Sequence, residues 1–243
     1  MRIALVGNPN SGKSSLFNHL TGLNQKIGNF PGVTVDKKIG YCQISPDTKA
    51  EIIDLPGTYS IYPNSTDEKI VFDILGDKTS PLYPDKVVVI VDASNFKRNL
   101  LLFTQIFDLG IPCVLALNMM DLVKKSGHAI DHAKLSKELG VPVAPIDARK
   151  GKGLDDLMKV LTLPVGPLKS LIFPAMDYAE EAIETVKEAF AVEEDYRAYQ
   201  LLQQHSISSN LTENEKSLLK DIAVKHEFNK DEKRRKETLE RNA

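Results

Sequence analysis

The stretch "GNPNSGKSS", residues 7–15, decides the fold, because it joins a short apolar run to a helical segment. Gly7, Gly12, Lys13 and Ser14 match the spacing G-x-x-x-x-G-K-S/T directly after the run "IALV". Glycines allow successive backbone N–H groups to turn inward toward phosphate oxygens, and the N-terminus of the following helix adds its positive dipole end. The motif therefore predicts a phosphate-binding loop between a strand and a helix.

Two side chains of this loop have predicted chemical roles. The Lys13 ammonium is expected to reach the β and γ phosphates of a nucleotide, and the Ser14 hydroxyl to take one position around Mg²⁺. The alternative is a Gly/Ser turn with an exposed lysine, which the full pattern in this context disfavours. The other loop residues expected to contact nucleotide are Asn8, Pro9, Asn10, Ser11 and Ser15.

Short apolar runs alternate with amphipathic stretches through about residue 165. The runs are rich in β-branched residues, and polar residues mostly do not alternate with the apolar ones, which is typical of strands buried on both faces. They span residues 3–6, 50–55, 86–93, 112–118 and 141–146. In residues 33–44 apolar and polar residues alternate more regularly, which predicts an edge strand, with antiparallel pairing as an option. The alternation argues for an α/β fold in which helices flank a mainly parallel six-stranded sheet.

The character of the chain changes after this part. Apolar residues between 177 and 190 recur on one helical stripe, and Thr212 with Glu215 forms a capping box ahead of another helix. We therefore expect two units, an α/β domain at residues 1–165 and a small all-α domain at residues 166–243.

The composition is that of an ordinary globular protein without a dominant charge. The 243 residues are 42% hydrophobic and 26% charged, with a formal net charge of −2. This balance gives no global positive field, so a nucleic-acid partner is not expected. Cys42 and Cys113 lack metal-type spacing, which fits a reduced compartment. No apolar run approaches the roughly 18 to 20 residues of a membrane span, so the chain as given is expected to stay in water.

Two further motifs predict the metal and the base. In "DLPG" (54–57), Asp54 is placed to hold Mg²⁺ through water and Gly57 to direct its N–H at a γ-phosphate. In "NMMD" (118–121), the Asp121 carboxylate can accept two hydrogen bonds from the N1–H and 2-amino groups of guanine. Adenine lacks this donor pair, so Asp121 is expected to select GTP over ATP. The predicted contacts are Asp54, Leu55, Pro56, Gly57, Asn118, Met119, Met120 and Asp121.

Each of these motifs alone is common, but in this order they resemble the translation-factor-type GTPases over residues 1 to about 163. The resemblance implies a P-loop GTPase fold and Mg²⁺-dependent GTP hydrolysis. It also implies a closing base-contact loop, usually Ser-Ala-Lys, which maps to Asp147, Ala148 and Arg149. Ala148 keeps the backbone amide that would touch the guanine oxygen, whereas Asp147 departs from serine. Met119 stands where most members have lysine, and its apolar length can still pack along the base.

More narrowly, the chain is similar to the cytosolic portion of the bacterial ferrous iron transport protein B family. The motifs that carry the similarity are "GNPNSGKSSLFN" (7–18), "IGNFPGVTVDKK" (27–38), "DLPGTYSI" (54–61) and "NMMD". In that family a helical, GDI-like domain said to favour GDP retention follows the GTPase domain, and a transmembrane iron-transport region comes after it. The resemblance implies a fragment at the cytoplasmic face of the inner membrane, with that region as its C-terminal partner. Self-association stays open.

The first switch is expected at "GVTV", residues 32–35. Thr34 would cap Mg²⁺ only when a γ-phosphate is present, so its loop would order with GTP and loosen after hydrolysis. The position after Gly57 is Thr58 rather than the glutamine of many GTPases, so slow intrinsic turnover is expected. Flanking nucleotide contacts are expected at Gly32, Val33 and Val35.

A potassium ion is expected beside the phosphates. Asn10 resembles the asparagine that helps to hold potassium in this family and its potassium-dependent relatives, and backbone carbonyls around Gly28 and Asn29 would complete the site. The ion would supply the positive charge that an arginine finger supplies elsewhere. The alternative for Asn10 is a turn residue in a tight loop. The expected catalytic residues are Asn10, Lys13, Thr34 and Gly57.

Three functions stay open at this level. The first is a regulatory GTPase module of a membrane iron transporter, and the second is a free-standing GTPase in ribosome or tRNA maturation. The third is a nucleotide-sensing module whose hydrolysis is incidental. The first is favoured over the second, because the charge balance is not basic and the C-terminal region carries no RNA-binding signature.

Overall fold

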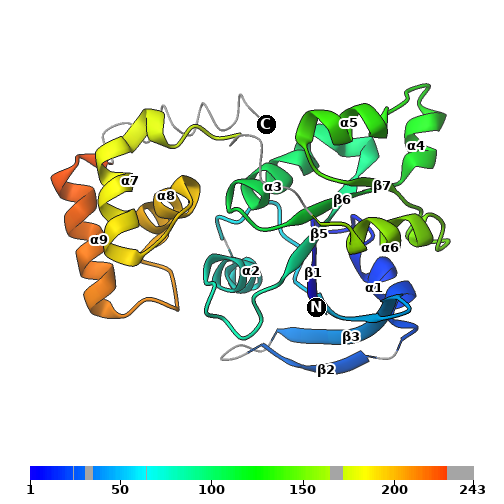
Figure 1. Cartoon of the computed structure of the whole chain (residues 1–243), viewed down its shortest axis with the longest axis horizontal. Coiled ribbons are helices and arrows are strands. Elements are labelled where there is room, and N and C mark those ends of the chain that lie inside the picture. Colours follow the sequence, from blue (N-terminus) through cyan, green and yellow to red (C-terminus); the bar gives the residue numbers. More distant parts are fainter. Residues whose placement is uncertain (24, 31–34, 64, 165–171, 229–243) are drawn as a thin grey trace.

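The computed structural model describes residues 1–23, 25–30, 35–63, 65–164 and 172–228, and a seven-stranded sheet lies at its centre (Figure 1). The strand order is β2-β3-β4-β1-β5-β6-β7. β1 pairs in parallel with β4 and β5, β5 with β6, and β6 with β7, which confirms the mainly parallel α/β sheet. The strands are β1 (Arg2–Gly7), β2 (Gln25–Asn29), β3 (Asp36–Ser45), β4 (Thr48–Asp54), β5 (Lys86–Asp92), β6 (Cys113–Asn118) and β7 (Val143–Pro145).

The predicted count of six strands was wrong, because β2 was not expected. Its sequence "QKIGN" carries a single strongly apolar residue, Ile27, whose side chain is exposed, so no hydrophobic pattern marks this strand. Its backbone instead pairs antiparallel with β3, from Gln25 opposite Gly40 to Asn29 opposite Asp36. β2 therefore takes the edge position. β3 is antiparallel, as the alternation allowed, but it lies inside the sheet and not at its edge.

Helices cover both faces of the sheet, as buried and unalternating strands require. α1 (Lys13–Thr21) and α6 (Leu154–Thr162) pack on one face, where Phe17 and Leu161 are fully buried. α2 (Thr66–Gly76), α3 (Phe96–Asp108) and α5 (His132–Leu139) cover the other face. The short elements η1 (Ala93–Asn95) and α4 (Met120–Lys125) follow directly from β5 and β6.

The C-terminal part of the chain forms a helical layer next to α2 (Figure 1). It comprises α7 (Met176–Phe190), α8 (Asp195–Gln204) and α9 (Glu213–Lys225), and α9 begins with the predicted capping box of Thr212 and Glu215. Tyr196 and Tyr199 of α8 are fully buried in the same apolar cluster as α2 and α3. The helical layer therefore shares a core with one face of the sheet. The predicted boundary at residues 165 and 166 lies at the start of a segment outside the described residues.

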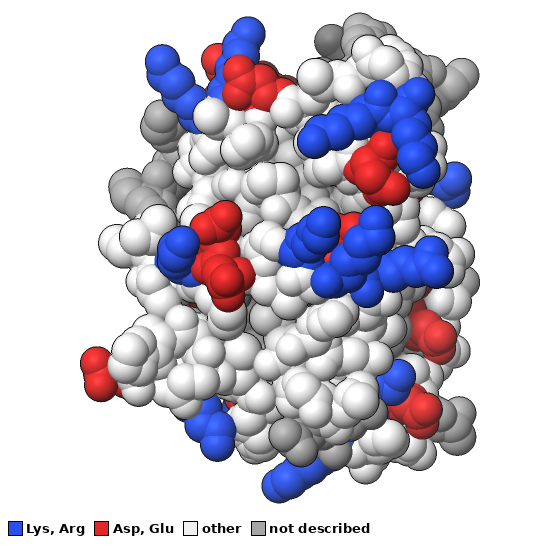
Figure 2. Space-filling model, turned by 90° about the vertical axis from the view of Figure 1, so that its right-hand side faces the viewer, with Lys and Arg blue, Asp and Glu red and all other residues white. Residues whose placement is uncertain are grey.

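The surface carries charges of both signs on the face that Figure 2 shows. Lys and Arg side chains gather there in groups, and Asp or Glu lies beside most of these groups. The visible face is thus mixed in charge, unlike the single-sign stripe typical of nucleic-acid binders. None of the described helices is both long enough and apolar enough to pass through a bilayer.

The strand register brings the predicted motifs to one edge of the sheet. Leu5 lies opposite Asp54, Gly7 opposite Ile90, and Asp92 opposite Asn118. The carboxyl ends of these parallel strands therefore meet, and the crevice outside them is where open α/β sheets bind ligands.

Candidate nucleotide-binding site

The loop between β1 and α1 is a tight turn that requires glycine at two positions. Gly12 has φ of 97°, and a Cβ added there would overlap the side-chain amide of Asn118. A Cβ at Gly7 would lie 2.7 Å from both a backbone oxygen of β5 and Ser11 Oγ. Asn10 also takes a left-handed φ of 65°, which asparagine tolerates better than most residues. The backbone therefore curls closely around the N-terminus of α1, as a phosphate-binding loop must.

Lys13, Ser14 and Asp54 lie together at one end of the site. Lys13 Nζ forms an ion pair with Asp54 Oδ1, and the two side chains are only 11% and 5% exposed. The Ser14 hydroxyl donates to Asp54 Oδ2 at 3.4 Å. Hydroxyl and carboxylate oxygens are the ligands that Mg²⁺ prefers, so this donor set fits the expected metal. Opening the Lys13–Asp54 pair would free the ammonium for phosphate and the carboxylate for the metal.

Asn118 joins two loops that are far apart in the sequence. Its Nδ2 donates to the Ser11 carbonyl oxygen at 2.8 Å, and its Oδ1 accepts from the Ala148 N–H at 3.0 Å. The side chain is buried, so both hydrogen bonds are shielded from water. Asn118 therefore fixes the phosphate-binding loop and the loop after β7 relative to each other. The Ala148 amide, which was expected to touch the base, is already paired, and Ala148 is fully buried.

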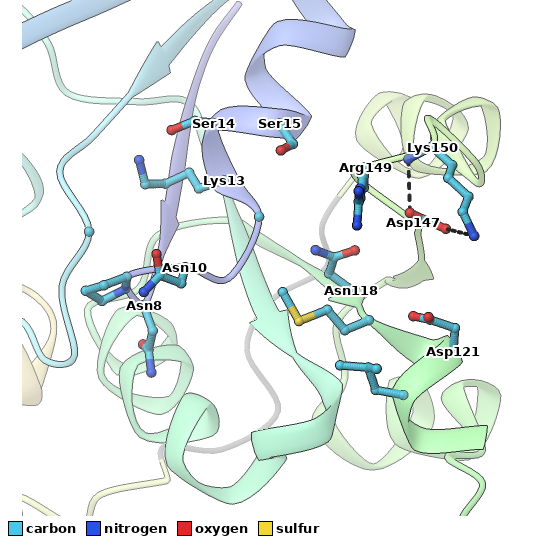
Figure 3. A pocket seen from close by; sticks show the side chains of 15 residues that line it. Asn8, Asn10, Lys13, Ser14, Ser15, Asn118, Asp121, Asp147, Arg149 and Lys150 are labelled. Carbon is cyan, nitrogen blue, oxygen red and sulfur yellow. Dashed lines mark hydrogen bonds and ion pairs between the residues drawn. The ribbon is translucent and has the colours of Figure 1, made fainter. Parts of the chain in front are cut away.

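A cleft of about 800 Å³ runs from Lys13 and Ser14 to the loops after β6 and β7 (Figure 3). The Asp121 carboxylate at its far end is 54% exposed, and its distance to Lys125 Nζ is 3.9 Å. Asp147 is turned toward its own loop, where Oδ1 accepts from the Lys150 N–H at 3.0 Å. Asp121 is thus the carboxylate at this end that is available to a base. The predicted residues that line the cleft are Asn8, Pro9, Asn10, Gly12, Lys13, Ser14, Ser15, Gly57, Asn118, Met119, Asp121, Asp147 and Arg149.

A second hollow of about 520 Å³ adjoins the first and shares Lys13, Ser14 and Gly57 with it. The predicted contacts Val35, Asp54, Leu55 and Pro56 line this hollow rather than the main cleft. Several lining residues were not predicted as contacts, because they lie next to the residues to which a motif assigns a role or come from another segment. These are Leu122 and Lys150 in the cleft, and Asp36, Lys38 and Asp67 in the hollow.

Some predicted site residues lie elsewhere. In the described part of the chain, neither hollow is lined by Gly7, Ser11, Met120 or Ala148. Gly28 and Asn29, the expected carbonyl donors to potassium, pair with Lys37 and Asp36 in the β2–β3 ladder and also line neither of them as described. Gly32, Val33 and Thr34 lie outside the described residues.

Thr58, which follows the "DLPG" motif, is fully buried. Its backbone N–H donates to the Gly7 carbonyl oxygen at 3.2 Å, which fixes this segment against the phosphate-binding loop. Its hydroxyl forms hydrogen bonds with the Ser60 carbonyl oxygen and with Glu68 Oε1. The side chain therefore faces the protein interior, and a water molecule in the cleft would have to be oriented by other groups.

Comparison with known proteins assigns the family. A family model described as "Ferrous iron transport protein B" matches residues 1–161. The chain belongs to this family. The matched segment contains the phosphate-binding loop, "DLPG", "NMMD" and the loop after β7.

Curated relatives of the family agree with this assignment. The Fe(2+) transport protein A/Fe(2+) transporter FeoB fusion protein of Porphyromonas gingivalis is 45% identical over 161 residues, which are 66% of this chain and 19% of that protein. The Fe(2+) transporter FeoB of Salmonella typhimurium is 44% identical over 163 residues, which are 65% of this chain and 20% of that protein. The chain thus spans about a fifth of the length of these relatives.

Solved structures of the family share the fold over nearly the whole chain. An NFeoB mutant of S. thermophilus bound to GDP is 35% identical, with a TM-score of 0.73, and the match covers 100% of this chain and 98% of that one. The cytosolic domain of L. pneumophila FeoB is 35% identical, with a TM-score of 0.75, over 94% of this chain and 91% of that one. The helical layer is therefore covered by the match as well as the sheet.

Proposed function

We propose that this chain binds GTP and GDP in the cleft after β1 and hydrolyses GTP slowly with Mg²⁺. The observation that carries the proposal is that the two ends of one cleft have different chemistry. Lys13 and Ser14 lie at one end beside Asp54, and the half-exposed Asp121 carboxylate lies at the other. A triphosphate and a guanine are complementary to these two ends. A solved relative of S. thermophilus is bound to GDP, which supports the same ligand here.

At the base end, Asp121 accepts hydrogen bonds from guanine and thereby excludes adenine. Met119, held at φ of 62° where α4 begins, packs its thioether along the base. The Ala148 amide, which was expected to contact the guanine oxygen, is occupied by Asn118. We therefore assign this contact to the neighbouring Arg149, whose side chain lines the cleft (Figure 3).

At the phosphate end, the Lys13 ammonium leaves Asp54 and binds the β and γ phosphates. Ser14, Asp54 and Thr34 would hold Mg²⁺, and the bound ion would neutralise charge that develops on the phosphates. The Gly57 N–H is directed at the γ-phosphate, and a Cβ added at Gly57 would lie 3.2 Å from backbone atoms of Pro9 in the loop. Turnover is slow because the Thr58 side chain is committed to the interior and does not orient a water molecule.

Asn10 is proposed to hold a potassium ion that increases the rate of hydrolysis. It lines the cleft in a left-handed conformation next to the expected phosphate position. We keep Gly28 and Asn29 as its proposed carbonyl partners, which requires β2 to approach the cleft. Replacement of Asn10 by alanine is expected to remove the difference between GTP turnover in potassium and in sodium. An undiminished potassium effect would rule out this role.

For the longer protein, we propose a regulatory nucleotide switch of a ferrous iron transporter at the cytoplasmic face of the bacterial inner membrane. Residues 1–165 would form its GTP-binding domain and residues 166–243 a helical domain that slows GDP release. The names of the curated relatives support iron transport, and their greater length supports a membrane region beyond this segment.

Phosphate release from GTP and from ATP, measured with Mg²⁺, tests the enzymatic proposal. We expect slow release from GTP and none above background from ATP. Binding of GTP without release over many hours would leave a nucleotide sensor and contradict the hydrolytic function. Equal rates of phosphate release from ATP and from GTP would contradict the role of Asp121.

A further inference from the structure

The loop after β7 is a closed turn that begins at Asp147. The Lys150 N–H donates to the Asp147 carbonyl oxygen at 3.1 Å, which is the hydrogen bond of a β-turn. The Asp147 N–H donates to the Lys152 carbonyl oxygen at 2.9 Å, and the Lys152 N–H returns a bond to the Asp147 carbonyl oxygen at 3.2 Å. Gly153 follows at φ of 77°, where an added Cβ would lie 2.3 Å from the Pro145 carbonyl oxygen. The loop therefore returns to the strand that it left.

The Asp147 carboxylate fastens this turn a second time. Its Oδ1 accepts from the same Lys150 N–H at 3.0 Å, and its Oδ2 lies 3.7 Å from Lys150 Nζ (Figure 3). The Lys150 side chain is 62% exposed, so its ion pair adds little, and the bond to the backbone N–H is the stronger restraint. Aspartate is favoured at the first position of a turn for this reason. The carboxylate thus acts within its own loop.

The two central residues of the turn point in opposite directions. Ala148 is fully buried, and its N–H donates to Asn118 Oδ1 at 3.0 Å. Arg149 is exposed, and its side chain lines the cleft (Figure 3). If the turn opened, Ala148 would still be held by Asn118, whereas the direction of the Arg149 side chain would no longer be fixed.

The backbone of Arg149 is also in contact with α1. Its carbonyl oxygen lies 3.4 Å from His19 Nε2, and a Cβ added at Gly151 would lie 3.1 Å from the His19 ring. α1 begins at Lys13, so this one helix contacts both the phosphate end and the base end of the cleft. The carbonyl group of Arg149 therefore faces α1 while its side chain faces the cleft.

We infer that Asp147 is a positioning residue for guanine binding, whose carboxylate holds the turn that directs Arg149 at the guanine oxygen. Asp147 does not contact the nucleotide itself. This inference rests on the proposed function, in which Arg149 makes that contact. A side chain held in its bound direction loses less conformational entropy on binding, so Asp147 slows the release of GDP. Hydrolysis takes place around Lys13, at the other end of the cleft, and does not depend on Asp147.

Release of a fluorescent GDP analogue from the whole chain, chased with excess GDP, tests this role. Asp147→Ala removes the acceptor and is expected to speed release at least about fivefold. Asp147→Asn keeps an oxygen acceptor for the Lys150 N–H and is expected to stay within about twofold of the wild type. Asp156→Ala on α6, where the carboxylate is 72% exposed, is the matched control and is expected to change nothing. Hydrolysis of bound GTP in a single turnover is expected to have the same rate in all four proteins.

The variant Arg149→Met tests whether Asp147 acts through Arg149. It is expected to speed GDP release, and adding Asp147→Ala to it is expected to change the rate by less than about twofold. Independent, multiplying effects of the two substitutions would overturn the inference. If Asp147→Ala does not fold, Asp147→Ser supplies a weaker hydroxyl acceptor and is expected to speed release at least about twofold.

The outcomes separate this inference from the proposed function. A wild-type chain that binds no GDP would overturn both of them. GDP binding by the wild type, with unchanged release from Asp147→Ala or equally fast release from Asp147→Asn, would overturn the role of Asp147 alone. A slower single turnover in Asp147→Ala would also overturn it, because the residue would then act on hydrolysis.

Discussion

The nucleotide cleft and the junction between α8 and the sheet use polar side chains in opposite ways. In the cleft, the Asp121 carboxylate is half-exposed and Lys13 is held by an ion pair that a phosphate can replace. At the junction, Arg197 and Asp108 are almost fully buried, and their hydrogen bonds go to backbone groups except for the one from Arg197 to the Tyr83 hydroxyl. The cleft is thus built to exchange partners, whereas the junction is built to hold two parts of the chain together.

Arg197 and Asp108 hold the junction from its two sides. Arg197 of α8 donates to the carbonyl oxygens of Gly76 at 2.6 Å and Leu109 at 3.3 Å, at the ends of α2 and α3. A cation at these helix ends also meets their negative dipoles. Asp108 of α3 accepts from the N–H groups of Ile172 and Phe173, both at 2.8 Å. If the helical layer separated from the sheet, the hydrogen bonds of both Arg197 and Asp108 would break and leave buried groups unpaired.

The largest effect is expected from Arg197→Met, which removes the cation but keeps much of the side-chain volume. Carbonyl oxygens at the C-terminal ends of α2 and α3 and the Tyr83 hydroxyl lose their donor, so the free energy of unfolding should fall by about 3–5 kcal/mol. Urea unfolding followed by circular dichroism measures this loss. Lys187→Met is the control, because its ion pairs lie within the helical layer. A loss no larger than that of the control would mean that Arg197 does not hold the junction.

Lys13→Met tests the other region and should act on function. Without the ammonium, charge on the phosphates is no longer neutralised, and we expect kcat for GTP to fall by about 10²–10³-fold. Phosphate release at saturating GTP measures the change. Lys159→Met on α6, whose ion pair with Asp156 is exposed, should leave kcat unchanged. Equal turnover in Lys13→Met and the wild type would remove Lys13 from the proposed machinery.

Asp108 should make the junction sensitive to pH. Burial raises the pKa of Asp108 from 3.8 to about 6, against the lowering effect of the hydrogen bonds from Ile172 and Phe173. The folded chain thus binds the proton more tightly than the unfolded chain, so this stabilisation is complete below about pH 4 and is lost as pH rises through about 6. At about 1.36 kcal/mol per pKa unit, the difference is about 3 kcal/mol.

The variant Asp108→Asn removes this titration. Its free energy of unfolding, measured in urea at several pH values, should vary less between about pH 4 and about pH 7 than that of the wild type. It should also be lower at low pH, because one backbone N–H then faces an amide donor. The same pH profile for both proteins would show that Asp108 does not titrate in this range.

The smallest effect is expected from Tyr62→Phe. The hydroxyl groups of Tyr62 and Tyr196 are 3.0 Å apart, and burial raises the pKa of both. Loss of this hydrogen bond should lower the free energy of unfolding by about 1 kcal/mol. Tyr178→Phe, in a ring that stacks on Phe173, is the comparison for hydroxyl removal at a partly buried position. A loss above about 3 kcal/mol would show that Tyr62 belongs with Arg197 among the main supports.

The two regions also differ in how far the sequence predicts them. Lys13, Asp54 and Asp121 could be placed because each belongs to a short motif at a strand end, where local geometry fixes the side chain. The bridging role of Asn118 could not, because its partner Ala148 lies on another loop. The same holds for Arg197 and Asp108, whose partners are 64 to 122 residues away. β2 was missed because backbone pairing with β3, and not an apolar pattern, forms it.

Recognition of guanine by Asp121 is tested most directly by replacing this residue with asparagine and measuring Kd for GDP and for xanthosine diphosphate. Xanthine has a carbonyl where guanine has its 2-amino group, so an amide donor at position 121 suits it better than a carboxylate. We expect Asp121→Asn to weaken GDP binding by about 10²-fold or more and to strengthen xanthosine diphosphate binding. Unchanged GDP affinity, with no gain for xanthosine diphosphate, would contradict this assignment of the cleft.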